Sequence, residues 1–127
     1  MRLLLDAHTF LWWVTNDPAL KRRARAAIAD VDNDCFLSHA SVWEMAIKAS
    51  LGKLKLPSPV GRFVAEQCEM NNFHLLPITL AHVAAVERLP LHHRDPFDRL
   101  LVAQAQHEGL TVVSRDPLLK TYGLPVI

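Results

Sequence analysis

The sequence predicts an α/β protein, a three-layer α/β/α domain around a central parallel sheet of four to five strands. Short, continuous apolar runs alternate along the chain with longer segments of helical spacing. Such runs are typical of strands buried on both faces of a parallel sheet, whose crossover connections are helices. A length of 127 residues with 50% hydrophobic residues suits one core, so residues 1–127 are expected to form a single domain.

The expected elements follow one another from the N-terminus. Apolar runs predict strands at 2–5, 35–38, 73–78, 111–114 and 125–127. Helical spacing predicts helices over 10–14, 18–29, 42–51, 60–70, 81–89 and 96–108, with a short one after Pro117. The glycine and prolines of residues 52–59 indicate a loop inside the domain.

Three Asp-Pro pairs, beginning at Asp17, Asp95 and Asp116, each precede a helical pattern. Aspartate is a favoured helix N-cap, and proline suits the first helical position because the N–H it lacks would have no partner there. Capping explains Asp17 fully. It is also the preferred interpretation of Asp95, which stays a secondary candidate for a site.

Overall composition excludes some functions and leaves others open. The net charge of +1 does not by itself indicate a nucleic-acid partner, although a basic cluster at 21–25 is compatible with one. Cys35 and Cys68 lie in apolar surroundings without CxxC spacing, as expected of reduced thiols in a cytoplasmic protein. Neither a signal peptide nor a membrane span is expected.

Two acids follow predicted strands directly. Asp6 ends the run Leu3 to Leu5, and Asp116 comes two residues after the predicted strand that ends at Ser114. Parallel strands bring their carboxyl ends to one edge of a sheet, where ligands bind in open α/β folds. Both acids are therefore candidate metal ligands, with a turn or cap role as the alternative for each. Ser114 is a candidate substrate contact or supporting hydrogen-bond donor.

Two further acids lie on predicted helices. Glu44 shares a polar stripe with Ser41 and Lys48 on a helix that is otherwise apolar, and a polar stripe on a buried helix faces something polar. Glu44 also fits a capping box with Ser41, and Lys48 is placed either to pair with Glu44 or to hold a phosphate. Asp98 shares a face with the apolar residues that must pack on the sheet, so it points inward.

Four carboxylates at one site require a cation, because like charges at close range oppose one another's ionisation. Oxygen ligands favour Mg²⁺ or Mn²⁺, and such an ion activates water for phosphodiester hydrolysis. The seven histidines show no zinc-binding spacing, and no phosphate-binding glycine loop occurs. The sequence therefore predicts catalytic, metal-binding acids at Asp6, Glu44, Asp98 and Asp116.

Four segments together resemble a known family: LLLDAHTFLWW, SVWEMAIK, DPFDRLLVAQA and TVVSRDPLL. They resemble, in order, the acidic motifs of bacterial PIN domains, particularly the VapC-type toxin ribonucleases of type II toxin–antitoxin modules. The resemblance places the same four acids at the family's metal-binding positions. It implies a Mg²⁺- or Mn²⁺-dependent endoribonuclease, a homodimer, an RNA substrate and a small cognate antitoxin. The alternatives are a non-catalytic PIN-like module that binds RNA or protein, and a structure-specific DNA nuclease.

Overall fold

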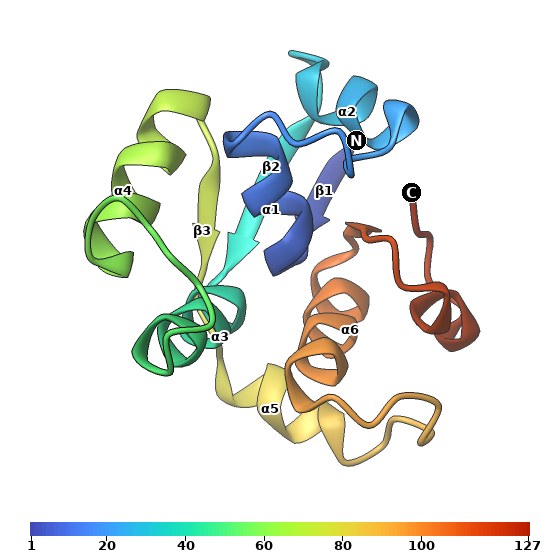
Figure 1. The fold of residues 1–127 in the computed structure, drawn as a ribbon. Helices are drawn as coiled ribbons and strands as arrows, with labels where there is room; N and C mark the ends of the chain where they lie inside the picture. Colours follow the sequence, from blue (N-terminus) through green and yellow to red (C-terminus); the bar gives the residue numbers. More distant parts are fainter.

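A computed structural model describes residues 1–127 and contains a four-stranded parallel sheet with helices on both faces (Figure 1). The strand order is β3-β2-β1-β4, so the N-terminal strand is central. The strands are β1 (Arg2–Leu5), β2 (Asp34–Ser38), β3 (His74–Leu76) and β4 (Thr111–Val113). The helices are α1 (Ala7–Val14), α2 (Arg22–Ala29), α3 (His39–Ser50), α4 (Val60–Asn71), α5 (Leu80–Val86), α6 (Pro96–Glu108) and the 3₁₀ helix η1 (Pro117–Tyr122). The predicted fold class is confirmed.

Alternate residues of β1 enter two different cores. Leu3 and Leu5 pack into the layer that contains buried side chains of α1, α2, α3 and α4. Leu4 packs on the opposite face, against residues of α6 and η1 such as Leu101 and Leu119. The three leucines are fully buried. This alternation explains why the run is continuously apolar: each face of the strand is covered by its own helical layer.

The strand register aligns the carboxyl ends of β2, β1 and β4. Leu5 pairs with Leu37 of β2 on one side and with Val113 of β4 on the other. Residues that follow these three positions therefore emerge together at one edge of the sheet. The predicted fifth strand at 125–127 is a single parallel bridge from Val126 to Val112, which extends the sheet beyond β4.

Several helix boundaries differ from the predictions, and side-chain caps explain the differences. Helix α1 begins at Ala7 because Asp6 is its N-cap, and α3 begins at His39 because Ser38 is its N-cap. Both helices therefore start three residues before the predicted boundaries at 10 and 42. Helix α6 spans 96–108 as predicted and ends at Gly109, whose φ of 68° is the left-handed conformation that glycine adopts readily.

The predicted helix at 18–29 was wrong in its first turn. Asp17 accepts a hydrogen bond from the backbone N–H of Ala19 and caps a turn, and α2 begins only at Arg22. Leu20 is 4% exposed and belongs to the core. The turn allows Leu20 to be buried before the helix starts. The predicted strand at 73–78 shortens to 74–76, and the predicted helix at 81–89 is observed at 80–86.

Both cysteines are buried and unpaired, as predicted. Burial raises the pKa of the Cys35 thiol to about 11, with a further contribution from the charge of Asp34. Burial also raises the pKa of Cys68. None of the helices is long and apolar enough to cross a membrane.

Candidate metal centre

Asp6 joins the central strand to α1. Its backbone N–H donates to the carbonyl of Val113 at 3.3 Å, so the residue lies at the junction of β1 and β4. Its Oδ1 accepts from the backbone N–H of Thr9 at 2.9 Å, and the side chain of Thr9 in turn donates to the same Val113 carbonyl. The residue is 9% exposed. One carboxylate oxygen of Asp6 thus caps α1 while the other remains free for a ligand.

Asp116 follows β4 and, like Asp6, caps the next helix with one carboxylate oxygen. Its Oδ1 accepts from the backbone N–H of Leu118 and caps η1, as the Asp-Pro pattern predicts. Its own backbone N–H donates to Oγ of Ser114 at 3.1 Å. Ser114 does not line the cavity that holds the acids and lies in a neighbouring one. Its observed contact fixes the turn that carries Asp116.

Glu44 lies in the second turn of α3 and forms an ion pair with Lys48, whose Nζ is 2.8 Å from Oε2. Since Ser38 caps α3, Ser41 and Glu44 are inside the helix and the capping-box alternative for Glu44 is wrong. Ser41 is 1% exposed, and its hydroxyl has no hydrogen-bond partner. The structure therefore does not bring Ser41 to the cavity.

Asp98 lies in the first turn of α6. Asp95 caps this helix as predicted, since its Oδ1 accepts from the backbone N–H groups of Phe97 and Asp98. The ring of Phe97 packs edge-on against Trp43 of α3, with ring centroids 4.9 Å apart. This contact joins α3 to α6 directly beside Glu44 and Asp98. It holds the two helix-borne acids on facing elements.

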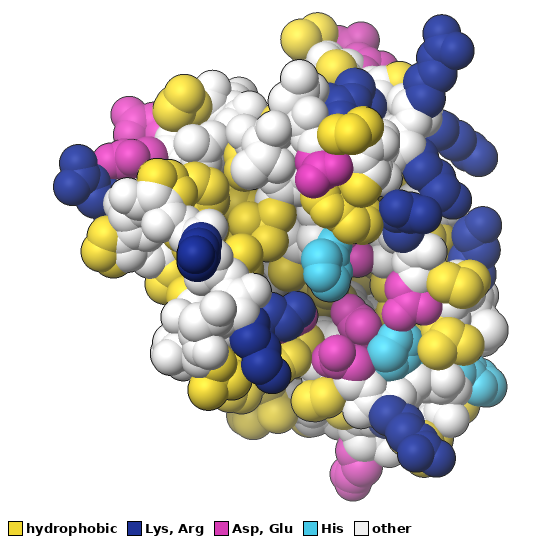
Figure 2. Space-filling view, viewed as in Figure 1, with side chains coloured by type: hydrophobic (Ala, Val, Ile, Leu, Met, Phe, Trp, Pro, Cys, Tyr) yellow, Lys and Arg dark blue, Asp and Glu magenta, His cyan; other side chains and the backbone are white.

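All four predicted acids line one cavity of about 190 Å³. Figure 2 shows acidic side chains and histidines gathered in a hollow, with Lys and Arg on the flanking surface. The lining residues are Asp6, Ala7, His8, Trp12, Glu44, Lys48, Asp95, Asp98, Arg115 and Asp116. Five carboxylates thus face two side-chain cations, and Asp95 and Lys48 join the acids as the sequence suggested.

The excess of negative charge acts on Asp98. The pKa of this carboxyl is raised to about 7, mainly by burial and also by the neighbouring charges of Asp95, Asp6 and Glu44, while His93 opposes the shift. A carboxyl that resists ionisation at neutral pH lacks a sufficient positive partner. A bound cation would supply that partner.

The donor set fits a hard divalent ion. The four predicted ligands offer only carboxylate oxygens, which Mg²⁺ and Mn²⁺ prefer. Asp6 and Asp116 are already held by N–H groups at helix starts, so their free lone pairs face a fixed position. The raised pKa of Asp98 agrees with this, because burial and the neighbouring acids both disfavour its charged form when no cation is bound.

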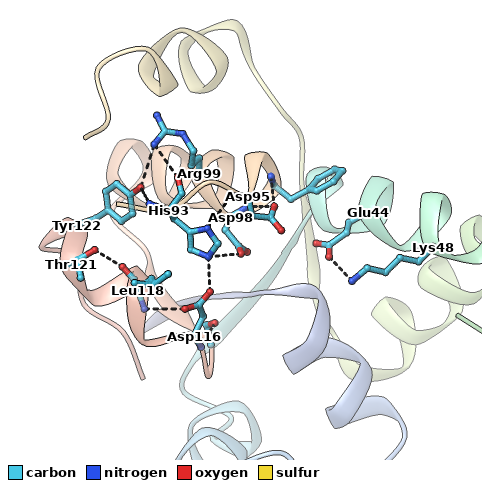
Figure 3. A network of polar contacts seen from close by, with 12 residues as sticks. Glu44, Lys48, His93, Asp95, Asp98, Arg99, Asp116, Leu118, Thr121 and Tyr122 are labelled. Carbon is cyan, nitrogen blue, oxygen red and sulfur yellow. Dashed lines mark hydrogen bonds and ion pairs between the residues drawn. The ribbon is translucent and has the colours of Figure 1, made fainter. Parts of the chain in front are cut away.

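His93 is a residue of this site that the sequence interpretation missed. Its Nε2 is 2.6 Å from Oδ2 of Asp116 and 3.1 Å from Oδ2 of Asp98 (Figure 3). The ring therefore lies between two of the predicted ligands. The histidines had been considered only as zinc ligands, and zinc-motif spacing contains no signal for a lone histidine in the loop before Asp95.

A second histidine group, His82, His107 and Glu108, has side-chain atoms close enough to share a metal ion. The Nδ1 of His82 accepts a hydrogen bond from the backbone N–H of Thr79, so in the neutral ring the proton is on Nε2. That nitrogen has no lone pair for an ion.

The fold and the site define a class of α/β proteins, those with a parallel sheet and acids gathered at the carboxyl ends of its strands. A family model identifies the family to which this chain belongs. The model described as "PIN domain" matches residues 3–123, and the chain belongs to this family. The resemblance found in the four sequence segments is confirmed.

Two proteins of similar sequence are named as ribonucleases. The chain is 29% identical over 124 residues to "Ribonuclease VapC22" of Mycobacterium tuberculosis, covering 97% of this chain and 93% of the relative. "Ribonuclease VapC16" of the same organism is 40% identical over 60 residues, which are 47% of this chain and 43% of the relative.

Solved structures share the fold. A chain in the structure of VapBC2 from Rickettsia felis, bound to a promoter DNA fragment, has a TM-score of 0.74 and 13% identity. That match covers 100% of this chain and 98% of the other. FitAcB from Neisseria gonorrhoeae gives a TM-score of 0.68 and 20% identity, over 98% of this chain and 96% of the other.

Proposed function

We propose that the chain is a Mg²⁺- or Mn²⁺-dependent endoribonuclease that hydrolyses RNA phosphodiester bonds and serves as the toxin of a type II toxin–antitoxin pair. The observation that carries the proposal is the convergence of Asp6, Glu44, Asp98 and Asp116 from four different elements into one cavity. Membership of the PIN family and the two relatives named as ribonucleases support it.

Each acid has a stated part in the proposed reaction. Asp6, Asp98, Asp116 and Glu44 hold the cation, with two of them fixed by their caps. When bound, the cation supplies a water of lowered pKa and offsets the charge that builds up on the phosphate. A carboxylate oxygen of the cavity that does not contact the cation accepts the proton of the attacking water.

The cationic side chains at the cavity wall suit the substrate. Lys48 is 39% exposed on its side chain, and Arg115 lines both this cavity and the neighbouring one that contains Lys21 and Arg23. Positive charge on that side would hold the phosphates that flank the cleaved bond. Ser114 acts by fixing the Asp116 turn, and Ser41 takes no part.

We further propose a small cognate antitoxin protein, a homodimeric assembly and a cytoplasmic location. The likeness of the fold to VapBC2 of Rickettsia felis and FitAcB of Neisseria gonorrhoeae supports the antitoxin partner. Exposed apolar side chains on α3 and α5, among them Trp43, Leu80 and Val83, offer surface for protein partners.

A nuclease assay tests the proposed activity. Purified protein should cleave single-stranded RNA with Mn²⁺ or Mg²⁺ and stop when EDTA is added. Asp6→Asn and Asp98→Asn should each lower the rate at least about 100-fold, because each removes a charged ligand. Asp17→Asn is the matched control, since Asp17 also precedes a proline but lies outside the cavity.

The same assay decides between the alternatives. Preferential cleavage of a structured DNA substrate would favour a DNA nuclease. RNA binding without cleavage, unchanged in both variants, would favour a non-catalytic module. Folding of each variant is checked by circular dichroism, so that loss of structure is not mistaken for loss of chemistry.

A further inference from the structure

His93 makes its contacts from the irregular segment between α5 and α6. Its single ring contacts Asp98 at the start of α6 and Asp116 at the start of η1, so it bridges acids that come from two elements (Figure 3). The side chain is 13% exposed. At first sight the three residues look like one metal site with a nitrogen ligand, because their atoms lie close enough to share an ion.

The other ring nitrogen fixes the orientation and tautomer. The backbone N–H of Asp95 donates to Nδ1 of His93 at 3.0 Å. Turning the ring by half a revolution would place carbon atoms at both contact positions, so the two polar contacts determine one orientation. Since Nδ1 accepts a hydrogen bond, it presents a lone pair, and the proton of the neutral ring is on Nε2.

The tautomer decides what His93 can do. An Nε2 that carries a proton donates to carboxylates and has no lone pair for a cation. Binding a cation through Nε2 would require the proton to move to Nδ1, where it would face the N–H of Asp95. The hydrogen bonding therefore opposes direct ligation.

We propose that His93 is a positioning residue: its Nε2–H is donated to Asp116 and lies beside Asp98, holds both carboxylates toward the cation, and leaves the ring outside the ligand set. The proposal rests on the proposed function, because it assumes that these acids bind a divalent ion. Outer hydrogen bonds to metal-binding carboxylates typically fix their orientation in this way.

The backbone of His93 is itself held at both ends. Its N–H donates to the hydroxyl of Tyr122 at 2.9 Å, and its carbonyl accepts from Arg99 at 3.4 Å. Arg99 also donates to the carbonyls of Pro90, Leu89 and Val86. These contacts tie a segment without helix or strand to α6 and η1. The ring is therefore presented at a fixed place before any ion arrives.

The first experiment reads the tautomer directly in the metal-free protein. Long-range ¹H–¹⁵N NMR of the histidine rings, recorded at a pH where the ring is neutral and with His93→Gln used to assign the signal, should show the single ring proton on Nε2. A ring protonated at Nδ1, or one that exchanges between tautomers, would overturn the proposal. This measurement does not depend on metal binding or on nuclease activity.

The second experiment measures Mn²⁺ affinity by calorimetry in two variants of similar size. His93→Leu removes the donor and should weaken binding about 10- to 100-fold, whereas His93→Gln keeps an N–H donor and should lose clearly less. His74→Leu and His74→Gln are the controls, since His74 is half-exposed on the edge strand β3 and does not line the cavity. Unchanged or tighter binding in His93→Leu, or an equal loss in both His93 variants, would contradict the positioning role.

Pulsed EPR of bound Mn²⁺ separates positioning from ligation. No coupling to a directly bound histidine nitrogen is expected, and detection of one would overturn the proposal. If the wild-type protein binds no Mn²⁺, the proposed function and the positioning of metal ligands both fail, and the NMR result still judges the hydrogen bond. If Mn²⁺ binding depends on the donor but no RNA is cleaved, the nuclease proposal alone fails.

Discussion

Replacing Asp98 by Asn should stabilise the metal-free protein at alkaline pH. The native carboxyl has a pKa of about 7, raised by burial and by neighbouring acids, compared with 3.8 for the ordinary group. Asn keeps a similar shape and an oxygen that can accept from His93, but it carries no charge. The variant therefore removes the electrostatic cost and keeps the packing.

The sign and size follow from proton linkage. Below about pH 4 the carboxyl is protonated in both states and contributes nothing. As pH rises from about 4 to 7, the unfolded chain ionises while the folded chain resists, so the free energy of unfolding falls. The difference between the two pKa values corresponds to roughly 4 kcal/mol above pH 7. With relaxation of a side chain that is 20% exposed, we expect a gain on the order of 2 to 4 kcal/mol at pH 8 and about a third of it at pH 5.

Urea denaturation followed by tryptophan fluorescence, with EDTA present, measures the effect at pH 5 and pH 8. Glu69→Gln is the control, because Glu69 is exposed on α4 and lies outside the cavity. Addition of Mn²⁺ at 1,000 times its dissociation constant should reverse the order at pH 8, since an ion at that concentration stabilises the wild type by about 4.1 kcal/mol. Parallel pH profiles for wild type and Asp98→Asn would refute the reasoning.

Two further outcomes follow from the buried contacts. Arg99→Lys should lower the free energy of unfolding by about 1 to 3 kcal/mol, because an ammonium group cannot reach the several carbonyls that the guanidinium bridges. Urea denaturation measures the effect, with Arg88→Lys at an exposed position as the control. Equal effects of the two substitutions would contradict the prediction. Cys35 and Cys68 should not react with a disulfide reagent at pH 8 in the folded protein, because burial raises the pKa of both thiols. Both should react once urea is added, and rapid labelling without urea would show that the thiols are accessible.

The order and type of the main elements were predictable because the strands are short apolar runs, and those of β1 and β4 are almost wholly buried. Helix starts were less predictable, since apolar spacing marks only where a helix packs. The first turns of α1 and α3 contain polar or small residues whose helical state depends on the caps Asp6 and Ser38. At Pro18 the predicted helix does not start, because burial of Leu20 in a turn outweighed a local signal for a helix start.

The candidate acids were predictable for a reason that the sequence interpretation did not anticipate. Capping and metal binding were treated as alternatives for Asp116 and Asp6, yet each carboxylate caps a helix with one oxygen only. The second oxygen of Asp6 has no protein partner, and that of Asp116 contacts His93. A short connection from strand to helix makes the two roles compatible. His93 was beyond prediction, because its contacts depend on how the segment before α6 folds against η1.

Because β1 pairs with β4, the site can form during synthesis only after both strands have been made. Asp6 is made about a hundred residues before its neighbours across the sheet, at 111–113, and before Asp116. Such non-local pairing is slow to form and requires all the intervening residues to be present. A growing chain therefore carries isolated carboxylates, and the complete acidic cavity arises only when β4 docks beside β1. A partner protein that recognises the assembled cavity would meet it only after Asp116 has been made.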